Sequence, residues 1–374
     1  MKKNKIILIS SLDNSANEER AKALIFELKQ SNYTIAVFDT KKHYSHMIKF
    51  DYLVTSPKRF IFYLINLIQY KLRFQKHYPL VNEMKLRNEI INKYIKKNQA
   101  KIIICQNPQD MLCILNRTKT HLSIYDSPTI YSEEVKNMNT FPKKELKAIK
   151  YIENNVFDKA DGVSFHWETF IKLAKELNKP ITNPIKANWG CSKRKKLGKF
   201  SKKPKIVYIG KLNAPWINPQ LLELIQASGG FPLDVFSYEK PEKLFKSLKY
   251  SGYLKNLNQI STYQFGLITM SNDFLRNSGF SAKHLLYISY GLPVLCPEWR
   301  QDKILRSATI SYNKNNFTDI VKYYSKKNNW LRKHQAALKL AKKLRWNKTL
   351  KPLIKHIESR INIKKANNQL TKYI

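Results

Sequence analysis

Residues 279–295, with the sequence GFSAKHLLYISYGLPVL, contain the residue types that bind a phosphate group. Gly279 and Ser281 precede a predicted apolar helix, and Lys283 falls in the first turn of that helix. Amides in a first helical turn lack intrahelical partners, and the helix dipole attracts an anion. A lysine there is unfavourable for the helix alone, so a bound phosphate would explain it. The alternative is an exposed lysine in a lysine-rich chain.

A second candidate segment, KIVYIGK at residues 205–211, ends in Gly210 and Lys211 after a predicted strand. A glycine at this point lets the backbone approach a ligand, and a lysine can neutralise a phosphate. An ordinary turn between a strand and a helix is the alternative. The phosphate-binding interpretation gains strength when this segment is paired with residues 279–283.

The elements that must position these residues alternate between apolar strands and amphipathic helices. In the first half, helical segments such as residues 17–31 separate predicted strands at residues 5–10, 33–39, 101–106, 122–126 and 162–166. After a linker at residues 183–204, a predicted helix at residues 218–228 accompanies strands at residues 205–211, 232–238, 265–270 and 293–297. This alternation predicts parallel sheets with helices on both faces. The fold class is therefore α/β, with two Rossmann-like, doubly wound domains that face a cleft and bind ligands at the carboxyl ends of their strands.

We place the domain boundaries at the linker and at the start of a basic tail. The first domain spans residues 1–190, the second spans residues 191–344, and residues 345–374 form a helical tail. Residues 321–374 contain a single acidic residue, Glu358, and Pro352 is expected to kink or split the helix.

The chain of 374 residues has a formal net charge of +41, because 68 lysines and arginines stand against only 27 acidic residues. Such an excess predicts an anionic partner, namely a membrane surface, a nucleic acid or another anionic polymer. A plain solvated surface is the alternative.

No apolar run reaches the ~20 residues that are needed to span a bilayer. Residues 59–74, RFIFYLINLIQYKLRF, are either a buried helix of the first domain or an interfacial helix that lies on lipid phosphates. The four cysteines are scattered, so the sequence predicts neither a zinc site nor a disulfide framework, and a reducing compartment is expected.

Residues 281–295, SAKHLLYISYGLPVL, resemble the nucleotide-sugar motif of the GT-B glycosyltransferases, in which a lysine precedes LLEYLAxGxPV. Other segments resemble this family in the same order, namely residues 123–128, 152–165, 186–192, 208–225 and 345–357. The resemblance covers most of the chain. The last of these segments is similar to the helix that crosses back to the N-terminal domain in this family.

The resemblance implies a nucleotide-sugar donor on the C-terminal domain, an acceptor on the N-terminal domain, and no required metal or cofactor. The positions that match the donor site of the family are Gly210, Lys211, Tyr250, Gly252, Gly279, Ser281 and Lys283. Among these, Tyr250 and Gly252 match the loop on the side of the base.

The chain departs from the retaining members of the family, many of which carry two glutamates eight residues apart. Ser278 and Leu286 occupy those positions here. The chain looks more like the group of the xanthan-pathway glucuronosyltransferase, an inverting, membrane-associated enzyme that also lacks the pair. The glycine-rich loop after the first strand is missing as well, and SSLDNSANEER stands in its place.

An inverting transfer needs a general base within hydrogen-bonding reach of the acceptor hydroxyl. Asp126, at the end of a predicted strand, is the first candidate, His166 is the second and Asp13 is the third. The alternatives are a turn cap for Asp126 and a buried structural role for His166.

The sequence therefore predicts a hexosyl- or glucuronosyltransferase-like enzyme that is inverting and metal-independent. It would move a sugar from a nucleotide, with UDP as the first choice, to a lipid-linked or cell-surface polysaccharide. We expect it in the cytoplasm, peripheral on the cytoplasmic face of the membrane.

Two alternatives remain open. Ser278 and Leu286 would also suit a catalytically degenerate GT-B protein. The charge fits a polyanion- or nucleic-acid-binding protein, although no helix-turn-helix, zinc-finger or aromatic RNA-binding motif occurs, so a nucleic-acid partner is not expected.

Overall fold

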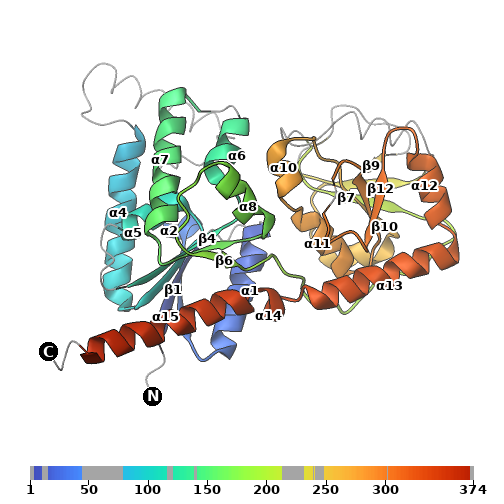
Figure 1. Cartoon of the computed structure of the whole chain (residues 1–374). Coiled ribbons are helices and arrows are strands. Elements are labelled where there is room, and N and C mark those ends of the chain that lie inside the picture. The colour runs from blue at the N-terminus through green and yellow to red at the C-terminus, as the bar shows by residue number, and fades with distance from the viewer. Residues whose placement is uncertain are drawn as a thin grey trace. The chain divides into compact units, whose positions relative to one another are not determined.

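The computed structural model divides the chain into two compact units (Figure 1). Unit 1 comprises Met1–Asn188 and Leu350–Ile374, and unit 2 comprises Trp189–Thr349. The structure describes residues 4–10, 16–43, 79–115, 121–138, 141–212, 231–238, 240, 248–300 and 302–370.

Unit 1 is built on a six-stranded parallel sheet with the strand order β2-β1-β3-β4-β5-β6. Its strands are β1 (Lys5–Ser10), β2 (Thr34–Asp39), β3 (Ile102–Cys105), β4 (Leu122–Ser127), β5 (Gly162–Phe165) and β6 (Pro184–Lys186). Every residue of the three strands β3, β4 and β5 is buried. Burial on both faces is what a parallel sheet with covering helices requires.

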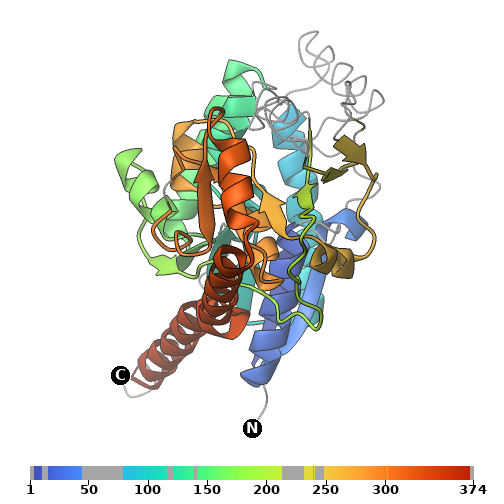
Figure 2. The same cartoon turned by 90° about the vertical axis from the view of Figure 1, so that its right-hand side faces the viewer.

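Helices surround this sheet and include the last helix of the chain. They are α1 (Ala16–Gln30), α2 (Thr40–His43), α4 (Pro79–Asn98), α5 (Pro108–Leu115), α6 (Tyr131–Met138), α7 (Lys143–Lys159), α8 (Thr169–Glu176) and α15 (Lys351–Leu370). Helix α15, the dark red helix that leads to the C-terminus in Figures 1 and 2, packs against β6 and β4. A Cβ atom at Gly162 would lie 2.8 Å from His356 Nε2, so a glycine there lets α15 approach the sheet. The expected return of the last helix to the first domain is confirmed.

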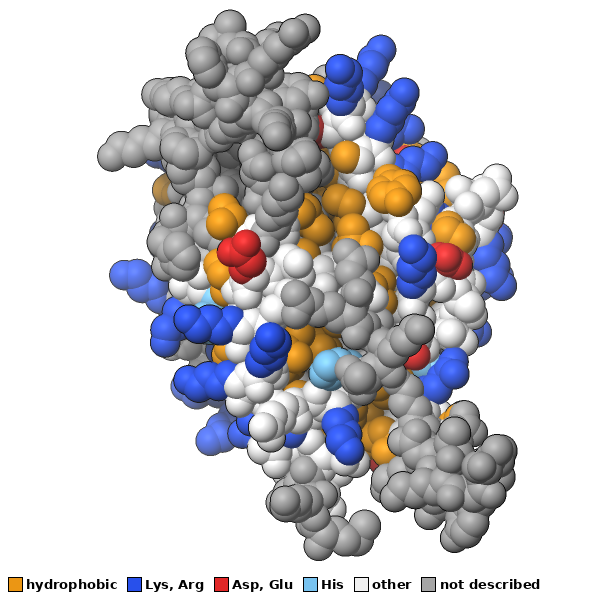
Figure 3. Space-filling model, turned by 90° about the vertical axis from the view of Figure 1, so that its left-hand side faces the viewer, with side chains coloured by type: hydrophobic (Ala, Val, Ile, Leu, Met, Phe, Trp, Pro, Cys, Tyr) orange, Lys and Arg blue, Asp and Glu red, His pale blue; other side chains and the backbone are white. Residues whose placement is uncertain are grey.

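Lysine dominates the surface that these helices present. Figure 3 shows a face on which lysine and arginine side chains outnumber acidic ones. Helices α4 and α7 alone expose Lys93, Lys96, Lys97, Lys143, Lys144, Lys147, Lys150 and Lys159. Within the described ranges, no helix is both long enough and apolar enough to cross a bilayer.

Unit 2 repeats the architecture with the strand order β12-β11-β10-β7-β8-β9, again all parallel. Its strands are β7 (Ile206–Ile209), β8 (Leu233–Phe236), β9 (Leu248–Tyr250), β10 (Phe265–Leu267), β11 (Val294–Pro297) and β12 (Thr309–Tyr312). Its helices are η1 (Leu257–Thr262), α10 (Phe274–Ser278), α11 (Ala282–Ser289), α12 (Phe317–Tyr324), α13 (Lys327–Lys343) and α14 (Trp346–Thr349). The predicted α/β class with two Rossmann-like units is thus confirmed.

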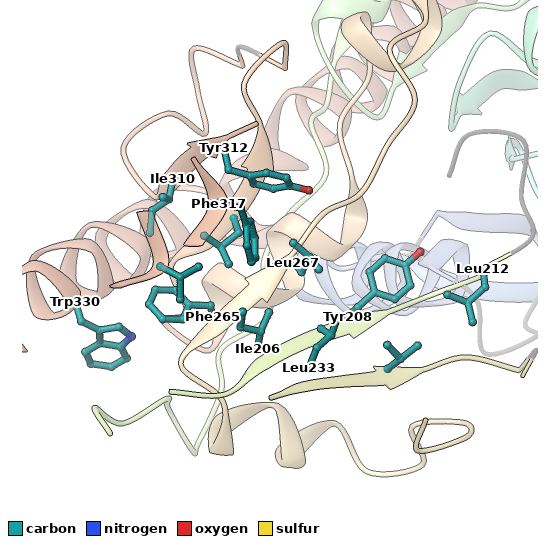
Figure 4. Close-up of a cluster of buried hydrophobic side chains, with 13 residues drawn as sticks. Ile206, Tyr208, Leu212, Leu233, Phe265, Leu267, Ile310, Tyr312, Phe317 and Trp330 are labelled. Atoms are coloured by element: carbon teal, nitrogen blue, oxygen red, sulfur yellow. The ribbon is translucent and has the colours of Figure 1, made fainter. Parts of the chain in front are cut away.

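The core of unit 2 is an apolar cluster that joins this sheet to α12 and α13 (Figure 4). Phe265 and Leu267 come from the middle of the sheet, and Phe317 and Trp330 come from the two helices. Tyr208 takes part in the cluster as a residue of β7 and is fully buried. The cluster therefore fixes the strand from which the candidate phosphate-binding residues emerge.

The boundaries between the units differ slightly from the expected ones. The chain passes from unit 1 to unit 2 after Asn188 and returns before Leu350, whereas the sequence suggested residues 190 and 344. Helix α14 stays with unit 2 because Trp346 packs on Trp189, with ring centroids 5.6 Å apart. The predicted helix at residues 218–228, the apolar segment 59–74 and Asp13 lie outside the described residues.

Candidate functional site

Lys283 and Gly210 meet at the carboxyl end of strand β7. The Lys283 ammonium crosses directly over Gly210, because a Cβ atom added to Gly210 would lie 2.4 Å from Lys283 Nζ. Gly210 also has a φ angle of +142°, which L side chains rarely adopt. A glycine is therefore needed at this position both for the backbone and for the close approach of the lysine.

Tyr208 contacts Lys283 through both its hydroxyl group and its ring. Lys283 Nζ donates to Tyr208 Oη at 3.1 Å and lies 4.5 Å from the centroid of the tyrosine ring. The same hydroxyl donates to the Lys211 carbonyl at 2.7 Å. One buried tyrosine thus positions both the side chain of Lys283 and the backbone of Lys211.

The electrostatics of this site are those of a cation without a counter-ion. Burial, and then the neighbouring Arg276 cation, lower the pKa of Lys283 from 10.5 to about 7. Among the residues that the structure describes, no carboxylate forms an ion pair with Lys283. A bound anion would oppose this lowering of the pKa, because an opposite charge favours the protonated form.

Gly279 and Ser281 connect α10 to α11 ahead of Lys283. The Gly279 carbonyl accepts a hydrogen bond from buried Arg300 Nη2 at 2.8 Å, which fixes the connection. Ser281 is the N-cap residue of α11, yet its buried side chain makes no capping hydrogen bond. The first turn of α11 therefore keeps amides that a phosphate could bind.

Tyr250 and Gly252 lie farther along the same edge of the sheet. The strand order places β9 two strand spacings from β7, which corresponds to roughly 10 Å. Gly252 has a φ angle of +67°, and a Cβ atom there would meet open space. Tyr250 Oη donates to the Ser237 carbonyl at 3.2 Å. The structure therefore groups Gly210, Lys211, Gly279, Ser281 and Lys283, and it sets this second pair apart.

An exposed aromatic pair that was not expected from the sequence lies beside Gly252. Tyr238 and Tyr253 stack with ring centroids 4.3 Å apart, and they are 70% and 42% exposed. Tyr208, Arg276 and Arg300 were missed as well. Lys283 and Tyr208 are 75 residues apart. No local pattern predicts such a contact, and only the proximity of Tyr208 to Gly210 in the sequence hinted at it.

The polar centre of unit 1 has a different character. Asp126 lies within β4, fully buried, and both of its oxygens accept hydrogen bonds from Arg20 at 2.6 and 2.8 Å. Ser164 Oγ donates to Asp126 Oδ1 at 2.8 Å, and Gln106 Nε2 donates to Asp126 Oδ2 at 2.9 Å. His166 Nε2 lies 3.2 Å from the same oxygen, Oδ2.

This packing changes what Asp126 and His166 can do. Burial alone would raise the pKa of Asp126, but Arg20 and then His166 hold it well below its usual value. Burial and Arg20 lower the pKa of His166 to about 4 despite the nearby carboxylate. His166 is therefore neutral at pH 7 and Asp126 is ionised. In this arrangement neither side chain reaches solvent, so a role as general base would require the Arg20 pair to open.

No protein-family model matches the chain, and no curated protein matches it either. Solved structures do match it over nearly its whole length. Sucrose-phosphate synthase from Thermosynechococcus elongatus has a TM-score of 0.63 at 10% identity, over 100% of both chains. The chain has the GT-B fold.

Two further structures agree with this fold. The α,α-trehalose-6-phosphate synthase from Burkholderia multivorans has a TM-score of 0.61 at 8% identity, over 98% of this chain and 99% of its own. The glycotransferase of kitacinnamycin has a TM-score of 0.54 at 8% identity, over 95% of this chain and 100% of its own. Identities this low establish the fold alone, so the activity has to be argued from the site.

Proposed function

We propose that the chain is a glycosyltransferase whose unit 2 binds a nucleotide-sugar donor. The observation that carries this proposal is Lys283, a cation held over Gly210 beside Arg276 with no carboxylate partner among the described residues. A nucleoside diphosphate would supply the missing negative charge. The same lysine would then stabilise the charge that develops on the diphosphate as the bond to the sugar breaks.

The finer assignment follows the resemblance to the inverting group of the xanthan-pathway glucuronosyltransferase. Ser278 ends α10 and Leu286 lies in α11, so neither position supplies a carboxylate near the donor. We therefore favour an inverting, metal-independent transfer of a hexosyl or glucuronosyl group from a UDP-sugar. The acceptor would be a lipid-linked or cell-surface polysaccharide at the cytoplasmic face of the membrane.

We assign the deprotonation of the acceptor to the Asp126–His166 pair. The pair could act as a base only after the contact between Arg20 and Asp126 opens. A neutral histidine oriented by a carboxylate has the right chemistry for this step. Arg20 donates hydrogen bonds to both carboxylate oxygens of Asp126, so the acceptor would have to displace the Arg20 guanidinium.

Thermal unfolding with UDP, GDP, CDP, ADP and TDP tests the proposal. We expect one nucleotide to stabilise the wild-type protein, by about 2.7 kcal/mol at a concentration of a hundred times Kd. Lys283→Ala should abolish this gain, whereas Lys322→Ala, which removes an exposed lysine of α12, should keep it. Stabilisation by no nucleotide would refute the donor site. Binding without transfer of any sugar would instead identify a catalytically degenerate protein.

A further inference from the structure

A dense set of cations lies on unit 2, away from the candidate donor site. Residues 193–205 contain no acidic residue. Their exposed basic side chains are Lys193, Lys195, Lys196, Lys199, Lys202, Lys203 and Lys205. We call the surface formed by this segment and the exposed side of α13 the basic strip.

The segment is fixed along α13 and runs antiparallel to it. At one end, Cys191 N donates to the Leu344 carbonyl at 2.7 Å, just beyond the end of the helix. At the other end, the rings of Phe200 and Trp330 lie 6.0 Å apart. Between them, Gly198 N donates to the Tyr290 carbonyl at 2.8 Å. The lysines of the segment therefore flank α13 in a defined geometry.

Helix α13 adds its own charges to the strip. Trp330, Ala337 and Leu340 form its buried side. The exposed basic residues at its start and along its other side are Lys326, Lys327, Arg332, Lys339, Lys342 and Lys343. No acidic residue occurs anywhere between Asp319 and Glu358. Among the described residues, no carboxylate forms an ion pair with the exposed lysines of the strip or with Arg332.

The strip lies at the amino ends of the strands in unit 2. Lys205 directly precedes β7, and Lys205 N donates to the side chain of Gln264, which directly precedes β10. Gln264 Nε2 in turn donates to the Lys199 carbonyl at 2.9 Å. Gly210 lies at the opposite end of β7. A partner on the strip would therefore leave the donor edge of this sheet uncovered.

We infer that the basic strip docks on an anionic lipid surface. All but one of its exposed cations are lysines, whereas recognition of individual phosphates favours the planar fork of arginine. Proteins that bind single-stranded nucleic acid also expose aromatic side chains for base stacking. In the strip Phe200 packs on buried Trp330 instead, and the large apolar residue that is exposed is Leu197, at 38%. A leucine among lysines suits an interface of headgroups and acyl chains.

Sedimentation with lipid vesicles tests this inference on the full chain. The strip variant carries Lys195→Gln, Lys196→Gln, Lys199→Gln, Lys202→Gln and Lys203→Gln. A matched control removes the same charge from unit 1 with Lys93→Gln, Lys97→Gln, Lys143→Gln, Lys147→Gln and Lys150→Gln. Each lysine near an anionic surface contributes about fivefold to partitioning. We expect the strip variant to bind phosphatidylglycerol-containing vesicles more than a hundredfold more weakly, and the control to bind within about fivefold of the wild type.

Several results would overturn the inference. Equal losses in the two variants would mean that net charge alone attracts the protein, and unchanged binding of the strip variant would place the contact elsewhere. Strip-dependent binding that favours polyuridylate over vesicles would make the surface a nucleic-acid site. Binding that persists at high salt or on phosphatidylcholine alone would exclude an electrostatic contact.

Two further measurements separate folding and the donor site from lipid binding. The same five positions changed to arginine should retain vesicle binding, which shows that charge is responsible rather than the fold of the segment. Lys283→Ala should bind vesicles like the wild type, because the inference does not depend on the donor site. Failure of the proposed transferase function would therefore leave this result unchanged.

Discussion

The two units place polar centres on similar parallel sheets, yet the two centres have opposite electrostatic states. In unit 1 the Asp126 carboxylate accepts hydrogen bonds from Arg20, Ser164 and Gln106. In unit 2 the Lys283 ammonium has a tyrosine as its partner and a second cation, Arg276, as its neighbour.

The difference is one between a buried charge that the protein itself satisfies and a charge that it leaves without a counter-ion. A buried charge whose partners are all supplied by the protein has little to gain from a ligand. A charge that is desolvated and left without a counter-ion gains a great deal from one. The comparison therefore supports the proposal that the polar centre of unit 2 binds an anion, and each part of this proposal can be tested.

Arg20→Met should have the largest effect, because it leaves the Asp126 carboxylate buried without its main partner. We expect a loss of about 3–5 kcal/mol in the free energy of unfolding, measured with urea. Lys22→Met, on the exposed side of the same helix, should cost less than about 1 kcal/mol. Arg20→Met/Asp126→Leu should recover much of the loss, since both charges are then removed. A small loss in Arg20→Met would mean that the pair opens readily, which would support the opened state that a role of Asp126 as a base requires.

The affinity for the nucleotide should depend on pH through Lys283. With a pKa of about 7, its ammonium is mostly protonated at pH 6 and mostly neutral at pH 8. The ratio of wild-type affinity to that of Lys283→Arg should fall about tenfold between these pH values. The ratio cancels the titration of the nucleotide itself, because arginine stays charged throughout. Isothermal titration calorimetry measures it, and a constant ratio would contradict the inferred environment of Lys283.

Without the nucleotide, the titration of Lys283 has the opposite dependence on pH: the stability of the folded protein rises with pH, whereas the affinity for the nucleotide falls. The unfolded chain holds this proton up to a pKa near 10.5, and the folded protein holds it up to about 7. Between these values the unfolded state binds more protons, so this residue makes unfolding less favourable as the pH rises. The destabilisation of the folded protein by the buried Lys283 ammonium is therefore fully present below about pH 7.

Tyr208→Phe should produce the smallest effect of the three substitutions in this comparison. It keeps the ring under Lys283 and removes the hydroxyl that bridges Lys283 and Lys211. We expect a loss of about fivefold in nucleotide affinity, corresponding to about 1 kcal/mol for a hydrogen bond. Tyr323→Phe, at an exposed position of α12, serves as the control in the same calorimetric titration. Unchanged affinity would show that packing alone positions Lys283.

The sequence was sufficient for the fold and for part of the candidate site. Alternating apolar strands and amphipathic helices predict two parallel sheets because burial periodicity is a local property. Gly210 and Lys283 could be singled out because Gly210 directly follows a strand and Lys283 lies in the first turn of a helix. The environment of Asp126 could not be predicted, because Arg20 lies on an amphipathic helix where an arginine normally faces solvent. Its pairing with Asp126 spans 106 residues, and only the assembled sheet brings the two together.

The chain enters and leaves unit 2 at one place. Cys191 N donates to the Leu344 carbonyl at 2.7 Å, and Gly190 lies so close to Trp346 that a Cβ atom would come within 2.6 Å of the indole ring. Because its two ends lie in contact, the segment of residues 189–349 could be exchanged as one cassette. Replacing this cassette with the corresponding part of another protein of this fold would exchange unit 2 through a single pair of neighbouring joints, while the sheet and last helix of unit 1 keep their own sequence.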